Sequence, residues 1–241
     1  MSPRTLICIP TYNERECVHT IVEGVRQAVP DATVMIVDDN SPDGTGRLAD
    51  EMAARDPKVR VLHRTTKEGL GGAYLHAFRV ALDEGWESIV QMDADFSHDP
   101  KDVPRLLSAL DEGADLAIGS RYVPGGGTRN WGLGRRAISR GGGIYARFAL
   151  GVGIQDLTAG FKAWRADTLR SIELAAVNAR GYGFQIEMTY RALRAGFHVT
   201  EIPILFRERR VGESKMSGRI ALEAFWKVPA LRARMQHPPR R

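Results

Sequence analysis

Residues 5–39 read TLICIPTYNERECVHTIVEGVRQAVPDATVMIVDD, and two apolar runs within them enclose a helical pattern. The runs Thr5–Ile9 and Thr33–Val37 are apolar at nearly every position, which is typical of strands buried on both faces. Apolar side chains between the runs recur at helical spacing: Cys17, Val18, Ile21, Val22 and Val25. A buried strand, a helix and a second buried strand form the unit from which parallel sheets are built.

The same alternation continues to residue 118. Strands are predicted at Val59–Leu62, Ser88–Met92 and Asp115–Ile118, and helices at Leu70–Leu82 and Pro100–Leu110. Because the strands are apolar throughout and helices join them, we predict an α/β fold. Its central sheet is mostly parallel and carries helices on both faces.

The remainder of the chain is less regular. Tyr122–Gly143 holds eight glycines and few apolar residues, which predicts a long loop leading into a helix that ends near Leu150. Three further elements are predicted beyond it: a strand at Phe161–Trp164, a helix at Phe184–Ala195 and a strand at Val199–Leu205. The segment Ser217–Met235 predicts a helix that is broken or kinked at Pro229.

The net charge of +5 on 241 residues is unevenly distributed. From Arg207 to Arg241 there are ten Lys and Arg but three acids, so this segment carries +7 and the first 206 residues carry −2. The distribution disfavours a nucleic-acid binder and favours an anionic partner at the C-terminal end.

No run approaches the roughly 18 apolar residues of a membrane span. We therefore expect one domain over residues 1–216, a basic tail over 217–241, and a cytoplasmic protein.

Unusual polar residues follow four of the predicted strands. Pro10–Glu14 follows the first strand, Asp38–Ser41 the second, Asp93–Asp95 the fourth and Ser120–Tyr122 the fifth. Ligands of open α/β sheets bind beyond the carboxyl ends of the strands. The four segments therefore predict one shared site.

Each segment also has a purely structural interpretation. Asp38 and Asp39 are equally well explained as caps of the following helix. Two acids in a solvated loop explain Asp93 and Asp95 when they are taken alone, and Tyr12 is compatible with a packing role. The placement of all four segments at strand ends is what favours a functional site.

The chemistry of this site follows from its carboxylates. Asp93 and Asp95, two residues apart, can offer oxygens to one divalent cation such as Mg²⁺ or Mn²⁺, which commonly bridges substrate phosphates. Asp39 can accept a hydrogen bond from a hydroxyl group, and Glu14 can bind the edge of a base. No glycine-rich nucleotide fingerprint follows the first strand, so a pyrophosphate would need the metal and basic side chains. Candidates for the latter are Arg121, Arg207, Arg209, Arg210 and Lys215.

Motifs spread over residues 9–216 carry a resemblance to a known family. They are IPTYNE (Ile9–Glu14), VDDNSPDGT (Val37–Thr45), GLGGAY (Gly69–Tyr74), MDADFSHDP (Met92–Pro100), GSRYV (Gly119–Val123), DLTAGFKAWR (Asp156–Arg165), GYGFQIEM (Gly181–Met188) and GESKM (Gly212–Met216). In this order they resemble the inverting GT-A glycosyltransferases of family 2, and among these the dolichol-phosphate (polyprenol-phosphate) mannose synthases. The resemblance implies a Rossmann-like sheet in a single GT-A domain, followed by a C-terminal acceptor-side region of helix and loop.

The resemblance also implies where a nucleotide sugar would bind. Its guanine end would lie at Pro10, Tyr12 and Glu14, and its nucleoside at Val37 and Asp39. Ala94 would line the nucleotide, and Asp93 and Asp95 would hold the metal and the diphosphate.

Phosphates of the donor or the acceptor would contact Arg121, Arg209 and Lys215 by the same resemblance. The implied catalytic residues are Asp95, Arg121, Arg209 and Lys215. One position departs from the family, because some relatives have a glutamine ligand where this chain has Ser97. Water or His98 would then complete the metal shell.

The implied activity is transfer of mannose from GDP-mannose to a polyprenyl monophosphate, with inversion at the anomeric carbon. A lipid acceptor implies peripheral attachment to the cytoplasmic face of a membrane. The amphipathic segment after Ser217, or a separate integral-membrane partner, would provide this attachment. The tail is equally compatible with a helix packed on the domain. Two other functions stay open, namely transfer of glucose from UDP-glucose and a non-catalytic nucleotide-sugar-binding subunit.

Overall fold

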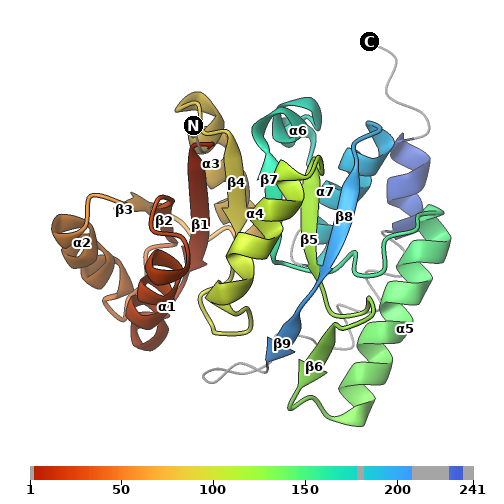
Figure 1. Cartoon of the computed structure of the whole chain (residues 1–241), viewed down its shortest axis with the longest axis horizontal. Helices are drawn as coiled ribbons and strands as arrows, with labels where there is room; N and C mark the ends of the chain where they lie inside the picture. The colour runs from red at the N-terminus through yellow and green to blue at the C-terminus, as the bar shows by residue number, and fades with distance from the viewer. Residues whose placement is uncertain (1–2, 178–181, 208–227, 236–241) are drawn as a thin grey trace.

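A mixed sheet of seven strands lies at the centre of the protein, in the order β3-β2-β1-β4-β7-β5-β8 (Figure 1). The computed structural model describes residues 3–177, 182–207 and 228–235. The strands of this sheet are β1 (Thr5–Thr11), β2 (Thr33–Asp38), β3 (Val59–His63), β4 (Ser88–Gln91), β5 (Leu116–Ser120), β7 (Lys162–Arg165) and β8 (Val199–Pro203). All of the strands predicted from the sequence are therefore confirmed, within a few residues at their ends.

Most neighbours in the sheet are parallel, as predicted. β1 pairs in parallel with β2 and β4, β2 with β3, and β5 with β8. β7 is the exception, because it lies antiparallel between β4 and β5. Gln91 at the end of β4 is paired with Lys162 at the start of β7. The residues that precede β7 therefore reach the edge where the parallel strands end.

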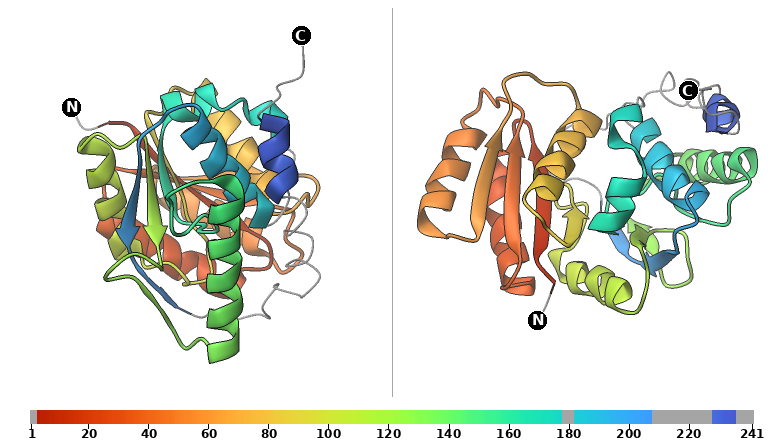
Figure 2. Two further views of the ribbon diagram at one scale, coloured as in Figure 1. Left: turned by 90° about the vertical axis from the view of Figure 1, so that its right-hand side faces the viewer. Right: turned by 90° about the horizontal axis from the view of Figure 1, so that it is seen from above.

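Helices cover both faces of the sheet, which is visible from above in Figure 2. One face packs against α1 (Arg15–Ala28), α2 (Thr45–Arg55) and α4 (Val103–Asp111), the last following the 3-10 turn η1 (Pro100–Asp102). The other packs against α3 (Leu70–Asp83), α6 (Ala166–Ser171), η2 (Leu174–Ala176) and α7 (Tyr182–Arg194). Alternation within β1 shows why the strands are apolar throughout. Leu6 and Cys8 enter one core, whereas Ile7 and Ile9 enter the other.

The prediction of a loop over Tyr122–Gly143 is wrong for much of its length. A short strand, β6 (Gly127–Arg129), pairs with β9 (Leu205–Arg207), and α5 (Leu133–Leu150) begins well before the cluster of three glycines. Glycine disfavours a helix interior by about 1 kcal/mol per residue relative to alanine. Burial of Ala146 and Leu150 against other helices outweighs that preference.

Residues 228–235 are helical and pack beside α5 (Figure 1). Val228 and Leu231 are buried in the same cluster as Leu150, and the Arg232 side chain donates a hydrogen bond of 2.8 Å to the Ala149 carbonyl. This part of the predicted tail is thus a packed helix. The rest of that prediction, before residue 228, lies outside the described residues. Among the described helices, none is long and apolar enough to cross a membrane.

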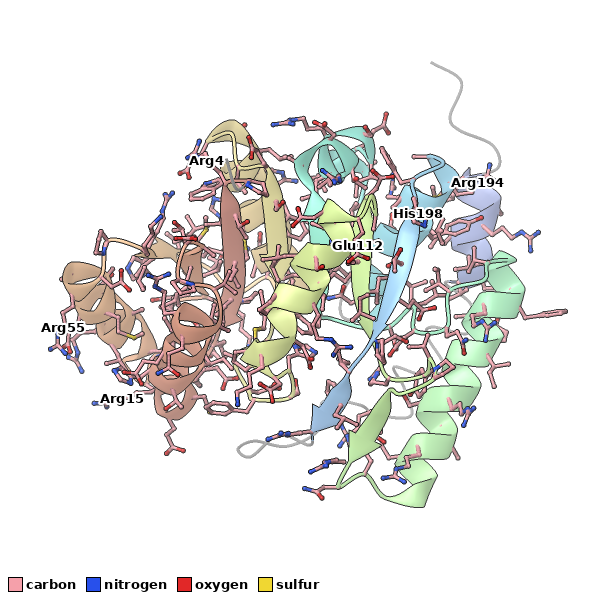
Figure 3. All side chains as sticks on the ribbon, in the orientation of Figure 1. Arg4, Arg15, Arg55, Glu112, Arg194 and His198 are labelled. Carbon is pink, nitrogen blue, oxygen red and sulfur yellow. The ribbon has the colours of Figure 1, made fainter. Side chains whose placement is uncertain are left out.

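Figure 3 identifies the two edges of the sheet. Arg4 and His198 immediately precede β1 and β8 and lie in the upper half of the view, whereas Arg15, which follows β1, lies at the lower left. The carboxyl ends of the parallel strands therefore face the lower edge, where β6 and β9 also lie.

Candidate active site

Loops that follow β1, β2 and β4 meet at the carboxyl edge of the sheet. Thr11 is in register with Asp38, and Cys8 pairs with Gln91 two residues before Asp93. Three of the four polar segments predicted to share a site are therefore on adjacent strands. The fourth follows β5, beyond β7.

Asp38 braces the loops of this edge. Its carboxylate accepts hydrogen bonds from the Thr11 hydroxyl (3.1 Å) and from the backbone N–H (3.1 Å) and hydroxyl (2.6 Å) of Ser41. It does not cap α2, whose N-cap residue is Gly44. Asp38 therefore has a structural role, but this role is not the predicted capping of α2.

Asp39 forms an ion pair with Arg64, and both side chains are only 6% exposed. Arg64 also donates a 2.6 Å hydrogen bond to Glu68. Burial raises the pKa of Asp39, although the Arg64 guanidinium opposes this effect. Arg64 is not among the site residues predicted from the sequence. Its position directly after β3 is the same signal that selected the other candidates.

The Tyr12 ring is covered by an ammonium group. Lys67 Nζ lies 3.3 Å from the ring centroid, a cation–π contact. Nearby, the backbone N–H of Glu14 donates a 3.0 Å hydrogen bond to the Thr45 hydroxyl. Pro10 is in register with the buried Val37. The five residues predicted for the nucleoside thus come from β1, β2 and the segments that directly follow them.

Asp93 and Asp95 follow β4 in a tightly bonded loop. Asp93 Oδ1 accepts a 3.2 Å hydrogen bond from the Tyr74 hydroxyl, and the Asp93 N–H donates to His98 Nδ1 at 3.3 Å. Asp95 is buried and accepts from the Ser97 N–H at 3.1 Å. Burial, reinforced by the Asp93 charge, raises the pKa of Tyr74 well above its usual value. Tyr74 therefore stays a neutral donor that orients Asp93. Ala94, between the two acids, is also buried.

Asp93 and Asp95 fit a divalent cation whose other ligands are mostly substrate phosphates and water. Within the described residues, no three His, Cys, Asp or Glu side chains group as a metal site. His98 directs Nδ1 at a backbone N–H and stacks on Phe161 at 4.9 Å. Gly160 lies directly beside Asp93, because a Cβ there would make a van der Waals contact of 3.4 Å with Asp93 Oδ2. Two carboxylates in one loop suit Mg²⁺ or Mn²⁺ bound together with substrate phosphates and water.

Arg121 is fixed by Asp156. Its backbone N–H, Nε and Nη2 donate to the Asp156 carboxylate at 3.0, 2.7 and 2.6 Å. Burial raises the pKa of Asp156, but the Arg121 guanidinium and its hydrogen bonds outweigh this and hold the pKa below its usual range. The guanidinium also lies within 5.2–5.7 Å of the ring centroids of Tyr122, Trp131 and Phe206. Asp156 begins one of the sequence motifs, but sequence alone did not select it.

Arg209, Arg210 and Lys215 lie outside the described residues. Arg207 ends β9, and its backbone N–H donates a 3.1 Å hydrogen bond to the Ser97 carbonyl. Arg207 Nη2 lies 3.5 Å from Asp99 Oδ2. The basic segment therefore starts beside the loop that carries Asp93 and Asp95.

The mixed α/β sheet, with paired carboxylates beyond its central strand, has the arrangement of a GT-A glycosyltransferase. The sequence profile of Glycosyl transferase family 2 matches residues 6–172, and the chain belongs to this family.

Curated relatives resemble the chain over most of its length. It is 55% identical over 226 residues to polyprenol monophosphomannose synthase of Mycolicibacterium smegmatis, covering 93% of this chain and 85% of the relative. It is 54% identical over 225 residues to undecaprenyl-phosphate mannosyltransferase of Micrococcus luteus, covering 93% and 92%.

A solved structure agrees in fold. The mannosyltransferase PcManGT from Pyrobaculum calidifontis, in complex with GDP-Man and Mn²⁺, superposes with a TM-score of 0.61 at 15% identity. The match covers 99% of this chain and 71% of that one.

Proposed function

We propose that this protein transfers mannose from GDP-mannose to a polyprenyl monophosphate, giving polyprenyl-phosphate-mannose with inversion at the anomeric carbon. The transfer of mannose to polyprenyl phosphate follows from relatives that share 54–55% of their residues with almost the whole chain. The observation that carries the chemistry is the pair Asp93 and Asp95 at the carboxyl end of β4. A leaving nucleoside diphosphate needs its developing negative charge stabilised at such a place.

The nucleotide would bind across β1 and β2. In this proposal Pro10, Tyr12 and Glu14 contact guanine, and Val37 and Asp39 contact the nucleoside. Lys67, which covers the Tyr12 ring, would either move away when the guanine base stacks on that ring or stay on the opposite face of the ring. Because Arg64 already holds Asp39, the carboxylate is oriented before the substrate arrives.

Asp93 and Asp95 would hold a divalent cation, with Ala94 lining the nucleotide. The cation, when bound, supplies Lewis-acid stabilisation of the leaving diphosphate. Arg209 and Lys215, from the basic segment after β9, would contact the phosphates. Arg121, held by Asp156, would orient the acceptor phosphate beside the rings of Tyr122, Trp131 and Phe206.

No general base is needed for the attack. The nucleophile is a phosphate oxygen, and a phosphate monoester with a second pKa near 6 is already largely ionised at neutral pH. The catalytic set Asp95, Arg121, Arg209 and Lys215 therefore acts by binding and charge stabilisation.

Substitution of either carboxylate tests this function. We expect Asp93→Asn and Asp95→Asn each to lower mannosyl transfer to a polyprenyl phosphate by about 10³-fold or more, because the metal and diphosphate lose an anionic ligand. Transfer is measured with radiolabelled GDP-mannose, in parallel with unfolding curves that verify the fold. Wild-type turnover in either variant would exclude these residues as the metal site.

The same assay separates the two alternative functions. Faster turnover of UDP-glucose than of GDP-mannose would replace mannose by glucose as the transferred sugar. Absence of turnover with either donor, in the presence of Mg²⁺ or Mn²⁺ and lipid, would favour a non-catalytic binding subunit.

A lipid acceptor requires the protein to reach a membrane surface, and we propose peripheral attachment on the cytoplasmic face. The observation that supports it is the outer side of α5, where Ile138, Ile144 and Phe148 are exposed. Arg136 and Arg140 lie on the same helix, as in helices that bind anionic interfaces. A separate integral-membrane protein is the alternative partner for this side.

A further inference from the structure

A chain of buried polar side chains links the sheet to α7 next to the candidate site. Trp164 Nε1 donates to Gln91 Oε1 at 2.9 Å, and Gln91 Nε2 donates to Gln185 Oε1 at 2.9 Å. Lys162 Nζ donates to the same Gln185 oxygen and to the Gln185 carbonyl, both at 2.9 Å. The four residues come from β4, β7 and α7.

This network fixes the orientation of the Gln185 amide. The indole N–H of Trp164 can only donate, so the Gln91 atom that faces it must be oxygen. Gln91 Nε2 is then directed at the Gly160 carbonyl and at Gln185, so the Gln185 atom that receives it must also be oxygen. Gln185 Nε2 therefore points away from Gln91 and Lys162.

Gln185 Nε2 has no hydrogen-bond partner among the described residues, although the side chain is only 3% exposed. The missing Cβ of Gly160 leaves room beside it. A Cβ at Gly160 would lie 3.7 Å from Gln185 Nε2 and 3.4 Å from Asp93 Oδ2. The unpartnered Gln185 amide donor and the Asp93 carboxylate therefore border the same position at Gly160, which holds no side chain.

The order of the strands indicates what lies at this position. Tyr12 and Asp39 follow β1 and β2, Asp93 follows the adjacent β4, and Gly160 precedes the next strand, β7. β7 is antiparallel, so its start lies at the same edge. A nucleotide sugar laid along this edge with its nucleoside at β1–β2 and its diphosphate at β4 places its hexose at Gly160 and Gln185.

We propose that Gln185 Nε2 donates a hydrogen bond to a hydroxyl group of the hexose of the bound nucleotide sugar, in the space left open by Gly160. This rests on the proposed function for the sugar donor. A buried amide donor without a partner is costly, and a substrate hydroxyl relieves that cost only when the correct sugar is present. Gln185 is thus a specificity-determining residue for the sugar.

Gln185→Glu tests the proposal with little change in shape. The carboxylate still accepts from Gln91 and Lys162, and replaces only the outward-facing donor by an acceptor. Burial lowers the pKa of Lys162 to about 7, and a carboxylate beside it would stabilise the protonated amine. We expect kcat/KM for GDP-mannose to fall by about 10- to 100-fold. The affinity for GDP, measured by calorimetry with Mg²⁺, should not change.

Gly160→Ala is the second variant. Its new methyl group meets only ordinary van der Waals contacts, so the protein should keep its wild-type melting temperature. The methyl group fills the proposed hexose space, and we expect the same selective loss with GDP-mannose. Thr189→Val is the matched control, because it removes another unpartnered buried polar atom of α7, about 6 Å further along the helix axis. It should behave as wild type.

Deoxy analogues of GDP-mannose identify the hydroxyl. For the wild-type protein, one deoxy analogue should be transferred more slowly than GDP-mannose. For Gln185→Glu, the same analogue and GDP-mannose should be transferred at equal rates, because the hydrogen bond is already lost. An equal loss of GDP and GDP-mannose affinity would assign Gln185 to the diphosphate and overturn the hexose contact. Wild-type kinetics in both Gln185→Glu and Gly160→Ala would also overturn it. The proposed function fails separately, if the wild-type protein itself does not transfer mannose.

Discussion

Arg121 donates three hydrogen bonds to a buried Asp156, and the backbone N–H of Asp156 in turn donates to Glu201. Removal of one partner from such a pair leaves the other charge buried without compensation. Arg121 therefore depends on Asp156 for its position and for the compensation of its buried charge. Arg121, which the sequence predicts to bind a phosphate, therefore also stabilises the loop after β5.

Asp156→Ala tests this dependence. We expect the free energy of unfolding in urea at pH 7 to fall by about 3–5 kcal/mol, because Arg121 loses its buried partner. Asp167→Ala, which removes a solvent-exposed ion pair with Arg170, is the control and should change it by about 0.5 kcal/mol or less. Equal effects of the two substitutions would contradict this interpretation.

The same pair predicts a pH dependence. The pKa of Asp156 is lower in the folded protein than in the unfolded chain, so its stabilisation is fully present above the unfolded pKa, about 4. It is lost as the pH falls through the folded value. The stability difference between wild type and Asp156→Ala should thus be constant from pH 5 to 7 and shrink below pH 4.

At the scale of elements, α5 is the helix whose sequence least favours its structure. Gly141, Gly142 and Gly143 lie within it, and the first two are exposed. A Cβ at Gly141 or Gly142 would meet no atom within 4 Å. The helix is held by the packing of its C-terminal half, where Ala146 and Leu150 are buried.

Gly141→Ala and Gly142→Ala should therefore stabilise the protein, each by about 0.5–1 kcal/mol. We expect each to raise the melting temperature by about 1–4 °C in calorimetry. Gly151→Ala is the contrasting variant. Gly151 caps the end of α5 with a φ of 69°, so a side chain at this position should destabilise the protein. A lower melting temperature for the first two would mean that α5 needs its glycines for another reason.

For the whole molecule, α5 lies at the edge of the protein (Figure 1), and it carries the exposed apolar side chains of Ile138, Ile144 and Phe148. Phe148 is 88% exposed, and Ile144 lies one turn before it. The adjacent helix at 228–235 buries Val228 and Leu231 against the domain, so these two side chains are not available to a lipid surface. Exposed apolar groups are thus concentrated on α5 among the described helices.

We expect Ile144→Ser with Phe148→Ser to reduce co-sedimentation with vesicles of phosphatidylglycerol and phosphatidylcholine by several-fold. Leu70→Ser, at the start of α3, removes another exposed apolar side chain and should leave sedimentation unchanged. Binding should weaken with salt, because arginines contribute to the attraction. Retention of full binding by the double variant would assign membrane contact to another part of the chain or to a membrane partner.

Local sequence determined the order of strands and helices, and with it the candidate site at the carboxyl edge. This is possible because burial on both faces makes each parallel strand apolar throughout, and because parallel strands bring their ends to one edge. Asp39, Asp93 and Asp95 could therefore be selected from their positions alone.

Only the tertiary structure decided which residues far apart in the sequence become neighbours. The antiparallel insertion of β7 between β4 and β5 brings Gly160 and Gln185 to Asp93, and no local pattern records which strands become neighbours. The pairing of Arg121 with Asp156, thirty-five residues later, has the same origin. α5 forms through glycines that local propensity disfavours, because the energy of packing exceeds the cost of their conformational freedom.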